Sequence, residues 1–487
     1  TGSGSGGDVL FDTPGSSAVL LAKPTRRINV GNSIIEESAG ATISGGGKNT
    51  IENAQYSVIA GGNYNLIQNS VASSNQIISG GRQNTIKNSS LGIITGGNNN
   101  LIESSSNAVI NTGFQNLIDR SDLASIHGGN NNTVRLAHTA VITHGKSNYI
   151  RNIGNDAQSR EIILGGSNNF ISNSKRSVIV GSSYNNISGT SSYTSIFGGR
   201  SNTIASSGGT QYSAGASVLS SFGNQISQSV NSAILVSNSN KILNSNDSTI
   251  LKGNNCTISN STKGVISHTT GSEIIEQSRY SSILGGTTNT INNNCTIASI
   301  HEGRFCIISG SNESISLGGQ TNTIQFSDKA FLCGGTNNLI TGTSNQFTGQ
   351  TIDPAFHAFI SGGNNNHIRY SDYSSIFNGN INTINSSTFS TVLGGRQNGI
   401  WRGTHVTAFG QNARSTDVSR AVVVGLDNGP FATNAVANST FTIGFDPNES
   451  ARGLYLLNNP SGSGTDSQIL GNGRVVTNTS SHRFKTQ

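Results

Sequence analysis

The sequence is dominated by a nine-residue pattern, I-x-G-G-x-x-N-x-I, that returns along most of its length. Clear copies run from Ile43 to Ile51, from Ile59 to Ile67 and from Ile94 to Ile102. Counting degenerate copies, 21 units begin between residues 43 and 392, and their commonest spacing is the one that separates Ile43 from Ile59. So regular a period is typical of proteins that stack one small structural unit on the next.

The unit from Ile43 up to Ile59 is too short for a pair of helices, and its Gly-Gly and β-branched Ile disfavour helix. Two short strands and two turns fit this length. One strand contains the leading Ile, the Gly-Gly step permits a tight turn with positive φ, and the second strand contains the closing Ile. We therefore expect an all-β fold, a parallel β-roll or β-helix solenoid whose coils lie about 4.8 Å apart.

Stacked coils place equivalent residues above one another, so the Ile positions should form two apolar ladders. The repeated Asn should form a ladder whose amides hydrogen-bond along the column. The residue after the closing Ile varies and is often charged, so it should point outward. On this basis Asp119 and Arg135 should meet one coil apart as a weak surface pair. The predicted Asn ladder contains Asn49, Asn65, Asn84, Asn100, Asn116, Asn132, Asn148 and Asn169.

The composition indicates a thin core. Of 487 residues, 33% are hydrophobic, 11% are charged and 61 are Gly. So short a coil holds only about two to four large apolar residues. We therefore expect several chains to share a core, with a homotrimer as the natural number for a fibre. The net charge of +6 is scattered rather than gathered in a basic run, which disfavours nucleic-acid binding. No stretch of about twenty apolar residues predicts a membrane span.

The four cysteines do not form a recognisable metal or disulfide motif. Cys256 and Cys306 each replace the repeated Asn. We interpret them as small fillers of interior positions. No C-x-x-C or H-x-x-x-H accompanies them, so we expect no metal and no other cofactor.

Two stretches near the C-terminal end of the repeats carry a family resemblance. The sequence Thr-Ala-Phe-Gly-Gln-Asn-Ala at residues 407–413 and Val-Val-Val-Gly at residues 422–425 look like the head repeats of trimeric autotransporter adhesins of the YadA type. The I-x-G-G-x-x-N-x-I units resemble the same class with a longer coil. The resemblance implies a left-handed parallel β-roll in which three chains associate.

The last residues carry a second resemblance. Residues 480–486, Ser-Ser-His-Arg-Phe-Lys-Thr, are similar to the opening of the endosialidase-type intramolecular chaperone that follows phage and viral tail fibres. That module trimerises its fibre and then cuts itself off. The resemblance implies a transient chaperone partner and a self-cleavage junction that uses a Ser and a nearby Lys. The matching positions are Ser481 and Lys485, with Ser480 as an alternative to Ser481.

We predict four segments along the chain. Residues 1–40 form a Gly/Ser leader with a cap or attachment segment, and residues 41–400 form the regular solenoid. Residues 401–445 form the YadA-like repeats, and residues 446–487 form a C-terminal cap with the start of the chaperone junction.

Four spacings are clearly longer than the rest, between the units that start at 59 and 78, 142 and 163, 196 and 218, and 332 and 360. Insertions in a solenoid become loops on its outside. Exposed aromatic residues with polar neighbours suit receptor contact, although such a loop can also fold back on the solenoid. The receptor-contact candidates are Tyr212, Phe347, Asp353, Phe356 and His357.

Enzyme chemistry finds little support in the sequence. Glu273 and Glu276 are close in sequence, and Glu302 replaces the first Gly of its unit without a second acid at the equivalent position one coil away. We therefore predict a structural and adhesive surface fibre, not an enzyme, displayed outside the cell on a virion, a phage-like particle or a cell. It would bind a glycan or a surface protein.

Two alternatives stay open at this point. One is a tailspike-like polysaccharide-degrading enzyme, which a carboxylate pair within about 10 Å would favour. The other is a purely structural spacer. Ice binding is disfavoured because the outward positions are irregular and charged.

Overall fold

The computed structural model describes residues 28–30, 32–69, 75–152, 160–206, 213–344, 351–353, 355–426, 433–435, 441–444, 453–456, 467–470 and 475–477. These residues form strands, turns and bends and no helix, so none of them belongs to a helix that could cross a membrane. The chain divides into two compact units, residues 1–302 and 303–487, each described by itself.

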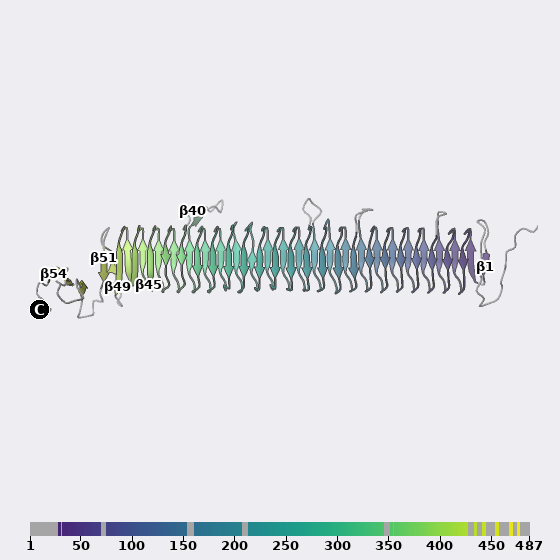
Figure 1. Ribbon diagram of the computed structural model, residues 1–487, viewed down its shortest axis with the longest axis horizontal. Coiled ribbons are helices and arrows are strands. Elements are labelled where there is room, and N and C mark those ends of the chain that lie inside the picture. Colours follow the sequence, from purple (N-terminus) through teal and green to yellow (C-terminus); the bar gives the residue numbers. More distant parts are fainter. Residues whose placement is uncertain are drawn as a thin grey trace, which may run out of the picture. The chain divides into compact units, whose positions relative to one another are not determined.

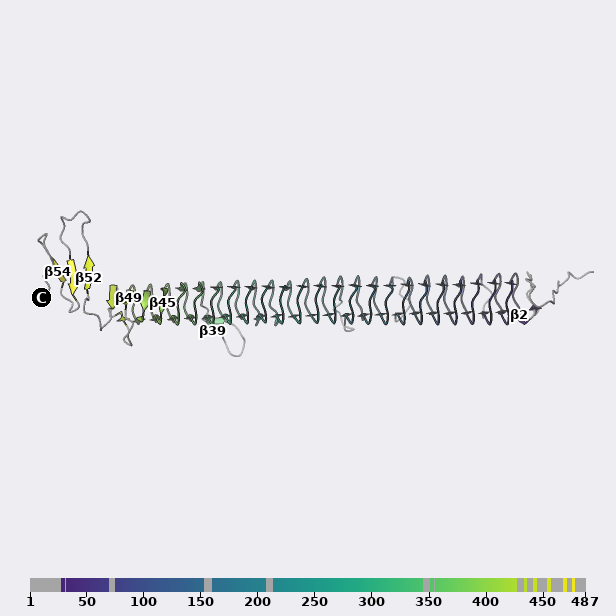
Figure 2. The ribbon, with the colours of Figure 1, turned by 90° about the horizontal axis from the view of Figure 1, so that it is seen from below.

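Unit 1 is a parallel β-solenoid in which every coil contributes one strand to each of two sheets, A and B (Figures 1 and 2). Neighbouring strands of a sheet come from successive coils and pair in parallel, as Ile102 of one coil pairs with Ile118 of the next. The predicted parallel β-solenoid, with short coils of the length expected from the repeat, is thus confirmed. Among the strands described in unit 1, only β1 (Ile28–Val30) is antiparallel, and it pairs with β2.

Sheet A of unit 1 consists of β2 (Ser33–Glu36), β4 (Thr50–Glu52), β6 (Leu66–Gln68), β8 (Thr85–Lys87), β10 (Leu101–Glu103), β12 (Leu117–Asp119), β14 (Thr133–Arg135), β16 (Tyr149–Arg151), β18 (Phe170–Ser172), β20 (Asn186–Ser188), β22 (Thr203–Ala205), β24 (Gln225–Ser227), β26 (Lys241–Leu243), β28 (Thr257–Ser259), β30 (Glu273–Ile274) and β32 (Thr290–Asn292). Sheet B of unit 1 consists of β3 (Thr42–Ile43), β5 (Val58–Ile59), β7 (Ile77–Ile78), β9 (Ile93–Ile94), β11 (Val109–Ile110), β13 (Ser125–Ile126), β15 (Val141–Ile142), β17 (Ile162–Leu164), β19 (Val178–Val180), β21 (Ser195–Phe197), β23 (Ser217–Leu219), β25 (Ala233–Leu235), β27 (Thr249–Leu251), β29 (Val265–Ser267), β31 (Ser282–Leu284) and β33 (Ser299–His301).

Unit 2 repeats this architecture. Its sheet A consists of β34 (Ile307–Ser309), β36 (Thr323–Gln325), β38 (Leu339–Thr341), β42 (His367–Arg369), β44 (Thr383–Asn385), β46 (Gly399–Trp401), β48 (Ala413–Thr416) and β50 (Thr433–Asn434). Its sheet B consists of β35 (Ile315–Leu317), β37 (Phe331–Cys333), β41 (Phe359–Ile360), β43 (Ser375–Ile376), β45 (Thr391–Arg396), β47 (Thr407–Gln411), β49 (Val422–Leu426) and β51 (Phe441–Gly444). Strands β47 to β51 therefore continue the same two sheets through the stretch that resembles YadA-type repeats.

Two antiparallel elements interrupt or follow the coils of unit 2. β39 (Thr343–Ser344) and β40 (Thr351–Asp353) pair as a hairpin within the longest insertion. β52 (Gly453–Leu456), β53 (Ser467–Leu470) and β54 (Val475–Thr477) pair in chain order as a small sheet. All four insertions predicted from the repeat spacing follow a sheet A strand and precede a sheet B strand.

The interior of a coil is narrow and is filled by five side chains. In the coil that begins at β9, these are Ile94, Asn100, Ile102, Ser105 and Ala108, and all are buried. Both isoleucine ladders are therefore covered within one chain. The isoleucines of a partner chain are not needed to cover them.

The Asn ladder hydrogen-bonds mainly to the backbone. Asn100 donates from Nδ2 to the carbonyls of Gly96 (3.1 Å) and Gly113 (3.0 Å). Its Oδ1 accepts from the backbone N–H of Asn116, 3.0 Å away. Amide-to-amide bonds, which we expected along the whole column, occur at few steps, such as Asn100 to Asn84. The ladder thus joins each coil to the next, and it supplies a partner to buried backbone groups such as the N–H of Asn116.

The second Gly of the pattern is required by the close approach of neighbouring coils. Gly97 has a φ of 93°, and a Cβ on it would lie 2.2 Å from the carbonyl oxygen of Gly113. A Cβ on Gly96 would meet nothing within 4 Å. The first Gly is therefore a less demanding position than the second.

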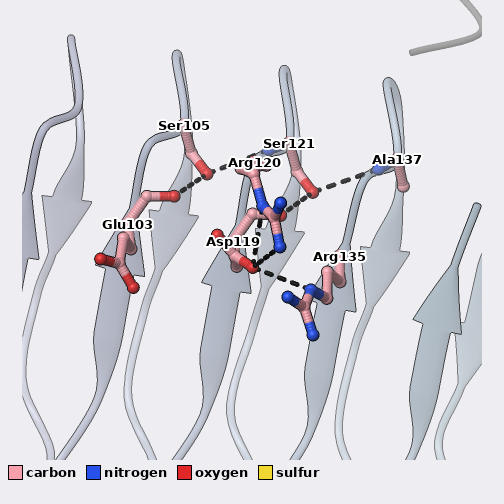
Figure 3. Close-up of polar contacts among 7 residues, drawn as sticks. All are labelled: Glu103, Ser105, Asp119, Arg120, Ser121, Arg135 and Ala137. Atoms are coloured by element: carbon pink, nitrogen blue, oxygen red, sulfur yellow. Dashed lines mark hydrogen bonds and ion pairs between the residues drawn. The ribbon is translucent and has the colours of Figure 1, made fainter. Parts of the chain in front are cut away.

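A serine column, not anticipated from the sequence, follows sheet A (Figure 3). The hydroxyl of Ser121 donates to the carbonyl of Asp119 (2.9 Å) and accepts from the backbone N–H of Ala137 (3.2 Å). The predicted pair also forms, since Arg135 Nε lies 2.9 Å from Asp119 Oδ2. Arg120 contacts the same oxygen at 3.3 Å. Asp119 is nearly buried, with 12% of its side chain exposed, so this group is less solvated than a surface pair.

Candidate aromatic site

Four aromatic side chains of unit 2 form a continuous stack at one corner of the coils. We call His357, Tyr373, Phe389 and His405 the aromatic column. Successive ring centroids are 4.8, 4.9 and 5.0 Å apart, with interplanar angles of 10°, 11° and 16°. Half of the surface of Tyr373 and of Phe389 is exposed, 51% and 50%. The stack is therefore an ordered aromatic surface in contact with solvent.

The solenoid backbone fixes the position of these rings. Each ring belongs to the residue two positions before a sheet B strand, where the chain turns with positive φ, 48° at Tyr373 and 50° at Phe389. The backbone N–H of Tyr373 donates to the carbonyl of Phe356 (2.7 Å), and that of Phe389 donates to Asp372 (3.0 Å). One ring per coil at the same corner gives the spacing that favours offset stacking.

The turns that carry the aromatic column, and the turn after them, also carry charged groups. The carboxylate of Asp372 accepts from the backbone N–H of Phe356 (2.9 Å). Arg402 and Asp417 form a bidentate ion pair, with N–O distances of 2.6 and 2.7 Å. The hydrogen bond from Arg402 lowers the pKa of Asp417, although both side chains are open to solvent. At the corner positions before and after the column lie two cations, Lys329 and Arg420.

The receptor-contact candidates chosen from the sequence fall only partly in this site. Phe356 and His357 are exposed, and their rings are in tilted contact with centroids 6.4 Å apart. Asp353 ends strand β40, which places its backbone in the hairpin that precedes them. Tyr212 and Phe347 lie outside the described residues.

Sequence reasoning missed Tyr373, Phe389 and His405. The signal was present, because His357, Tyr373, Phe389 and His405 follow one another at the regular repeat spacing and all four are aromatic. Tyr373, Phe389 and His405 belong to the regular coils, whereas the predicted receptor contacts were placed in the insertions.

The aromatic corners of unit 1 differ from this column. There, isolated rings meet a cation of the neighbouring coil, as Lys48 lies 4.8 Å from the Tyr64 ring centroid and Arg176 lies 5.0 Å from that of Tyr193. Such pairs contribute about 0.5–1 kcal/mol at exposed sites. The described part of unit 1 carries one aromatic stack, between Tyr149 and Phe170 on sheet A, with centroids 5.3 Å apart.

The other candidate residues lie apart from the aromatic column in sequence. Glu302 is exposed. The equivalent residue one coil earlier is Gly285, as predicted. Ser480, Ser481 and Lys485, the self-cleavage candidates, lie outside the described residues.

Two carboxylate pairs that the sequence analysis did not identify occur on sheet A of unit 1. Glu36 pairs in register with Glu52, and Glu103 pairs with Asp119. Glu52 accepts a hydrogen bond from Gln68 Nε2 (2.8 Å), and Asp119 is held by two arginines.

The cysteines form no disulfide. Cys256, Cys295 and Cys306 are buried and Cys333 is half-buried. Burial raises the pKa of the Cys306 thiol. Within the described ranges, no group of three or more His, Cys, Asp or Glu side chains gathers where it could hold a metal ion.

Comparisons with known proteins do not identify a family. No protein-family model matches the sequence, and no curated protein matches it. One similar solved structure is that of a proposed acetyltransferase from Desulfovibrio desulfuricans G20, at 11% identity and a TM-score of 0.09. The alignment covers 60% of this chain and 63% of that one, so the chain spans less than two thirds of that protein. A TM-score this low supports no statement about fold or function.

Proposed function

We propose that this chain is the body of an extracellular surface fibre that binds a receptor through the aromatic column of unit 2. The observation that carries the proposal is the exposure of Tyr373 and Phe389 within a stack of four rings. Burial inside the solenoid does not require these rings, because the coil core is filled by other side chains. Exposed, ordered aromatic residues are the usual anchors of binding surfaces.

The backbone makes the column suitable for binding. Every ring is held by a coil whose corner is hydrogen-bonded to the coil before it. Binding therefore costs little additional side-chain ordering. Because each inner ring has a neighbour on both faces, a receptor would contact ring edges and the cations Lys329 and Arg420. A glycan or a surface protein with apolar patches and acidic groups fits this surface.

The remaining parts of the proposal rest on the sequence. We keep the homotrimer, the transient C-terminal chaperone with self-cleavage at Ser480 or Ser481, and display on a virion, phage-like particle or cell as parts of it. The YadA-type and endosialidase-type resemblances support these parts. A structural spacer without a receptor is the outcome if the aromatic column binds nothing.

The test compares the wild-type chain with a Tyr373→Asn/Phe389→Asn double variant on glycan arrays and on intact cells. Asn is chosen because it tolerates the positive φ of these corners. The matched control is Tyr149→Thr/Phe170→Thr, which removes the stacked pair of unit 1. We expect binding to fall at least tenfold in the first variant only. Equal binding by all three proteins would refute the aromatic site.

The carboxylate pairs favour a second candidate function, cleavage of a polysaccharide. Glu36 and Glu52 belong to adjacent strands about 4.8 Å apart, near the separation of about 5–5.5 Å used by retaining glycosidases. Both are half-buried on the outer face of sheet A, however, and are not enclosed in an apolar pocket as the acid of lysozyme is. A Glu36→Gln variant tests this candidate. Release of reducing ends by wild type, lost in the variant, would support it, and no release from any polysaccharide panel member would reject it.

A further inference from the structure

The two outer faces of unit 1 differ in charge. Across its sixteen strands, sheet B contains no Asp, Glu, Lys or Arg. Sheet A has the same number of strands and carries nine charged residues. These are Glu36, Glu52, Lys87, Glu103, Asp119, Arg135, Arg151, Lys241 and Glu273. The expectation that outward positions are charged therefore holds for sheet A and is wrong for sheet B.

The middle of the sheet B face is also apolar. Its strands end in a column of large side chains that are paired in register from coil to coil, with Leu164 beside Val180 and Val180 beside Phe197. Leu164, Phe197 and Leu219 are 40%, 43% and 37% exposed. The full column is Leu164, Val180, Phe197, Leu219, Leu235 and Leu251.

The area of this face approaches that of a protein interface. Sixteen strands at about 4.8 Å extend for roughly 72 Å. The strands from β17 to β33 have three residues and are about 10 Å wide, and those from β3 to β15 have two and are about 7 Å wide. The footprint is then on the order of 600 Å², somewhat below the roughly 800 Å² per partner of a standard interface. Within this footprint the apolar column runs from Leu164 to Leu251, and a patch of exposed apolar side chains on a monomer generally marks an interaction site.

The absence of charge indicates a second copy of the chain as the partner. When identical solenoids lie parallel around a common axis, the same residue of every copy lies at the same height. A charged residue facing that axis would meet its own copies and repel them. An uncharged face avoids this repulsion along its whole length. A copy also presents the same strand spacing, so its side-chain columns match this face at every coil.

We propose that copies of this chain associate side by side and in parallel through the outer face of sheet B in unit 1, with sheet A turned to solvent. This interface specifies how the copies of the proposed trimeric fibre meet, and it rests on that proposed function. It differs from the shared core expected from the sequence, because the isoleucine ladders stay inside each chain and only outward side chains meet.

Charge placed on the sheet B face tests the proposal. Phe197→Asp/Leu219→Asp puts two carboxylates on β21 and β23, and Ala205→Asp/Ser227→Asp puts two on β22 and β24 of the same coils. All four positions point outward and none is buried. Light scattering should give a multiple of 50.5 kDa for wild type and for the sheet A variant, and 50.5 kDa for the sheet B variant. Circular dichroism verifies that each variant retains its β structure.

A cysteine placed at Ser217 provides a second measurement that does not depend on dissociation. In a parallel, in-register assembly Ser217→Cys meets its own copy and should form an inter-chain disulfide on oxidation, whereas Ser227→Cys on sheet A should not. A monomeric wild type would overturn the interface. So would dissociation of the sheet A variant alone, or a disulfide formed by Ser227→Cys and not by Ser217→Cys. A monomer that still binds cells through Tyr373 and Phe389 would overturn the interface and leave the receptor proposal standing.

Discussion

The side-chain oxygen of Asn132 accepts a hydrogen bond from the backbone N–H of Asn148 across a distance of 3.0 Å. The same side chain donates to the carbonyls of Gly128 (3.1 Å) and Gly145 (3.0 Å). One buried amide therefore satisfies three backbone groups of two coils.

Asn132→Ala should destabilise unit 1 strongly because it removes the partner of the Asn148 N–H and of the Gly128 carbonyl. The carbonyl of Gly145 keeps the hydrogen bond that it accepts from the backbone N–H of Asn130 (2.8 Å). Each buried unsatisfied group costs about 1–3 kcal/mol, so we expect a loss of at least about 2 kcal/mol. Thr133→Ser, on the outer face of the adjacent strand, is the control and should change little. Guanidinium unfolding with amide exchange at these coils measures both. Equal midpoints for the two variants would contradict a structural role for the ladder.

Gly97→Ala and Gly96→Ala form a matched pair of neighbouring substitutions. The new methyl group at residue 97 would lie 2.2 Å from the Gly113 carbonyl oxygen, and the residue would also be held at positive φ. We expect a cost of about 3 kcal/mol or more at residue 97. At residue 96 the methyl group enters open space, so the change should stay within about 0.5 kcal/mol. Thermal unfolding of both proteins measures the difference, and similar losses would argue against the coil spacing.

The thiols of unit 2 should react in order of burial. Burial raises the pKa of Cys306 and keeps it as a thiol, whereas Cys333 is only half-buried. A thiol reagent at neutral pH should modify Cys333 in a fast phase and Cys306 only after unfolding, because the thiolate is the reactive form. Cys333→Ser should remove the fast phase. Rapid labelling of Cys306 in the Cys333→Ser protein would contradict its interior position.

His367 should make unit 2 sensitive to acid. Burial, followed by the charge of Arg369, lowers its pKa below the ordinary 6.5. A base with a lowered folded pKa binds its proton more readily when unfolded, so its neutral form supports stability above about pH 6.5 and the loss begins as the pH falls below that value. Nuclear magnetic resonance titration should give a pKa under 6.5, and Arg369→Gln should raise it. A value at or above 6.5 in wild type would show that the ring is solvated.

The regular part of the fold was predictable because the same sequence pattern recurs in every coil. The Ile spacing indicated two strands per coil, and the repeat period placed Asp119 and Arg135 as neighbours one coil apart. The corners of the coil were not predictable in this way, since residues such as Ser104 and Asn107 adopt positive φ without being Gly. Recurrent corners of this kind explain the abundance of Asn and Ser, whose short polar side chains tolerate the conformation.

The candidate site was predicted only in part. Phe356 and His357 were predicted to contact a receptor because they belong to the longest insertion. Tyr373 and Phe389 occupy a position of the regular coil whose residue type varies from coil to coil. Recognising the column required knowing that this position is a corner and that its side chains face solvent. The uncharged face of sheet B was hidden for a similar reason, because apolar residues on both sides of a buried Ile do not reveal which of them face outward.

All four insertions lie in the chain between a sheet A strand and the next sheet B strand, while the nine-residue pattern that leads from sheet B to sheet A keeps its length. Insertions are therefore confined to the connection from sheet A to sheet B, where they do not change the register of either sheet. A peptide grafted there, for example between Gln228 and Ser232, would be displayed at a height fixed by its coil. Peptides grafted into different coils would then be separated along the solenoid by multiples of about 4.8 Å.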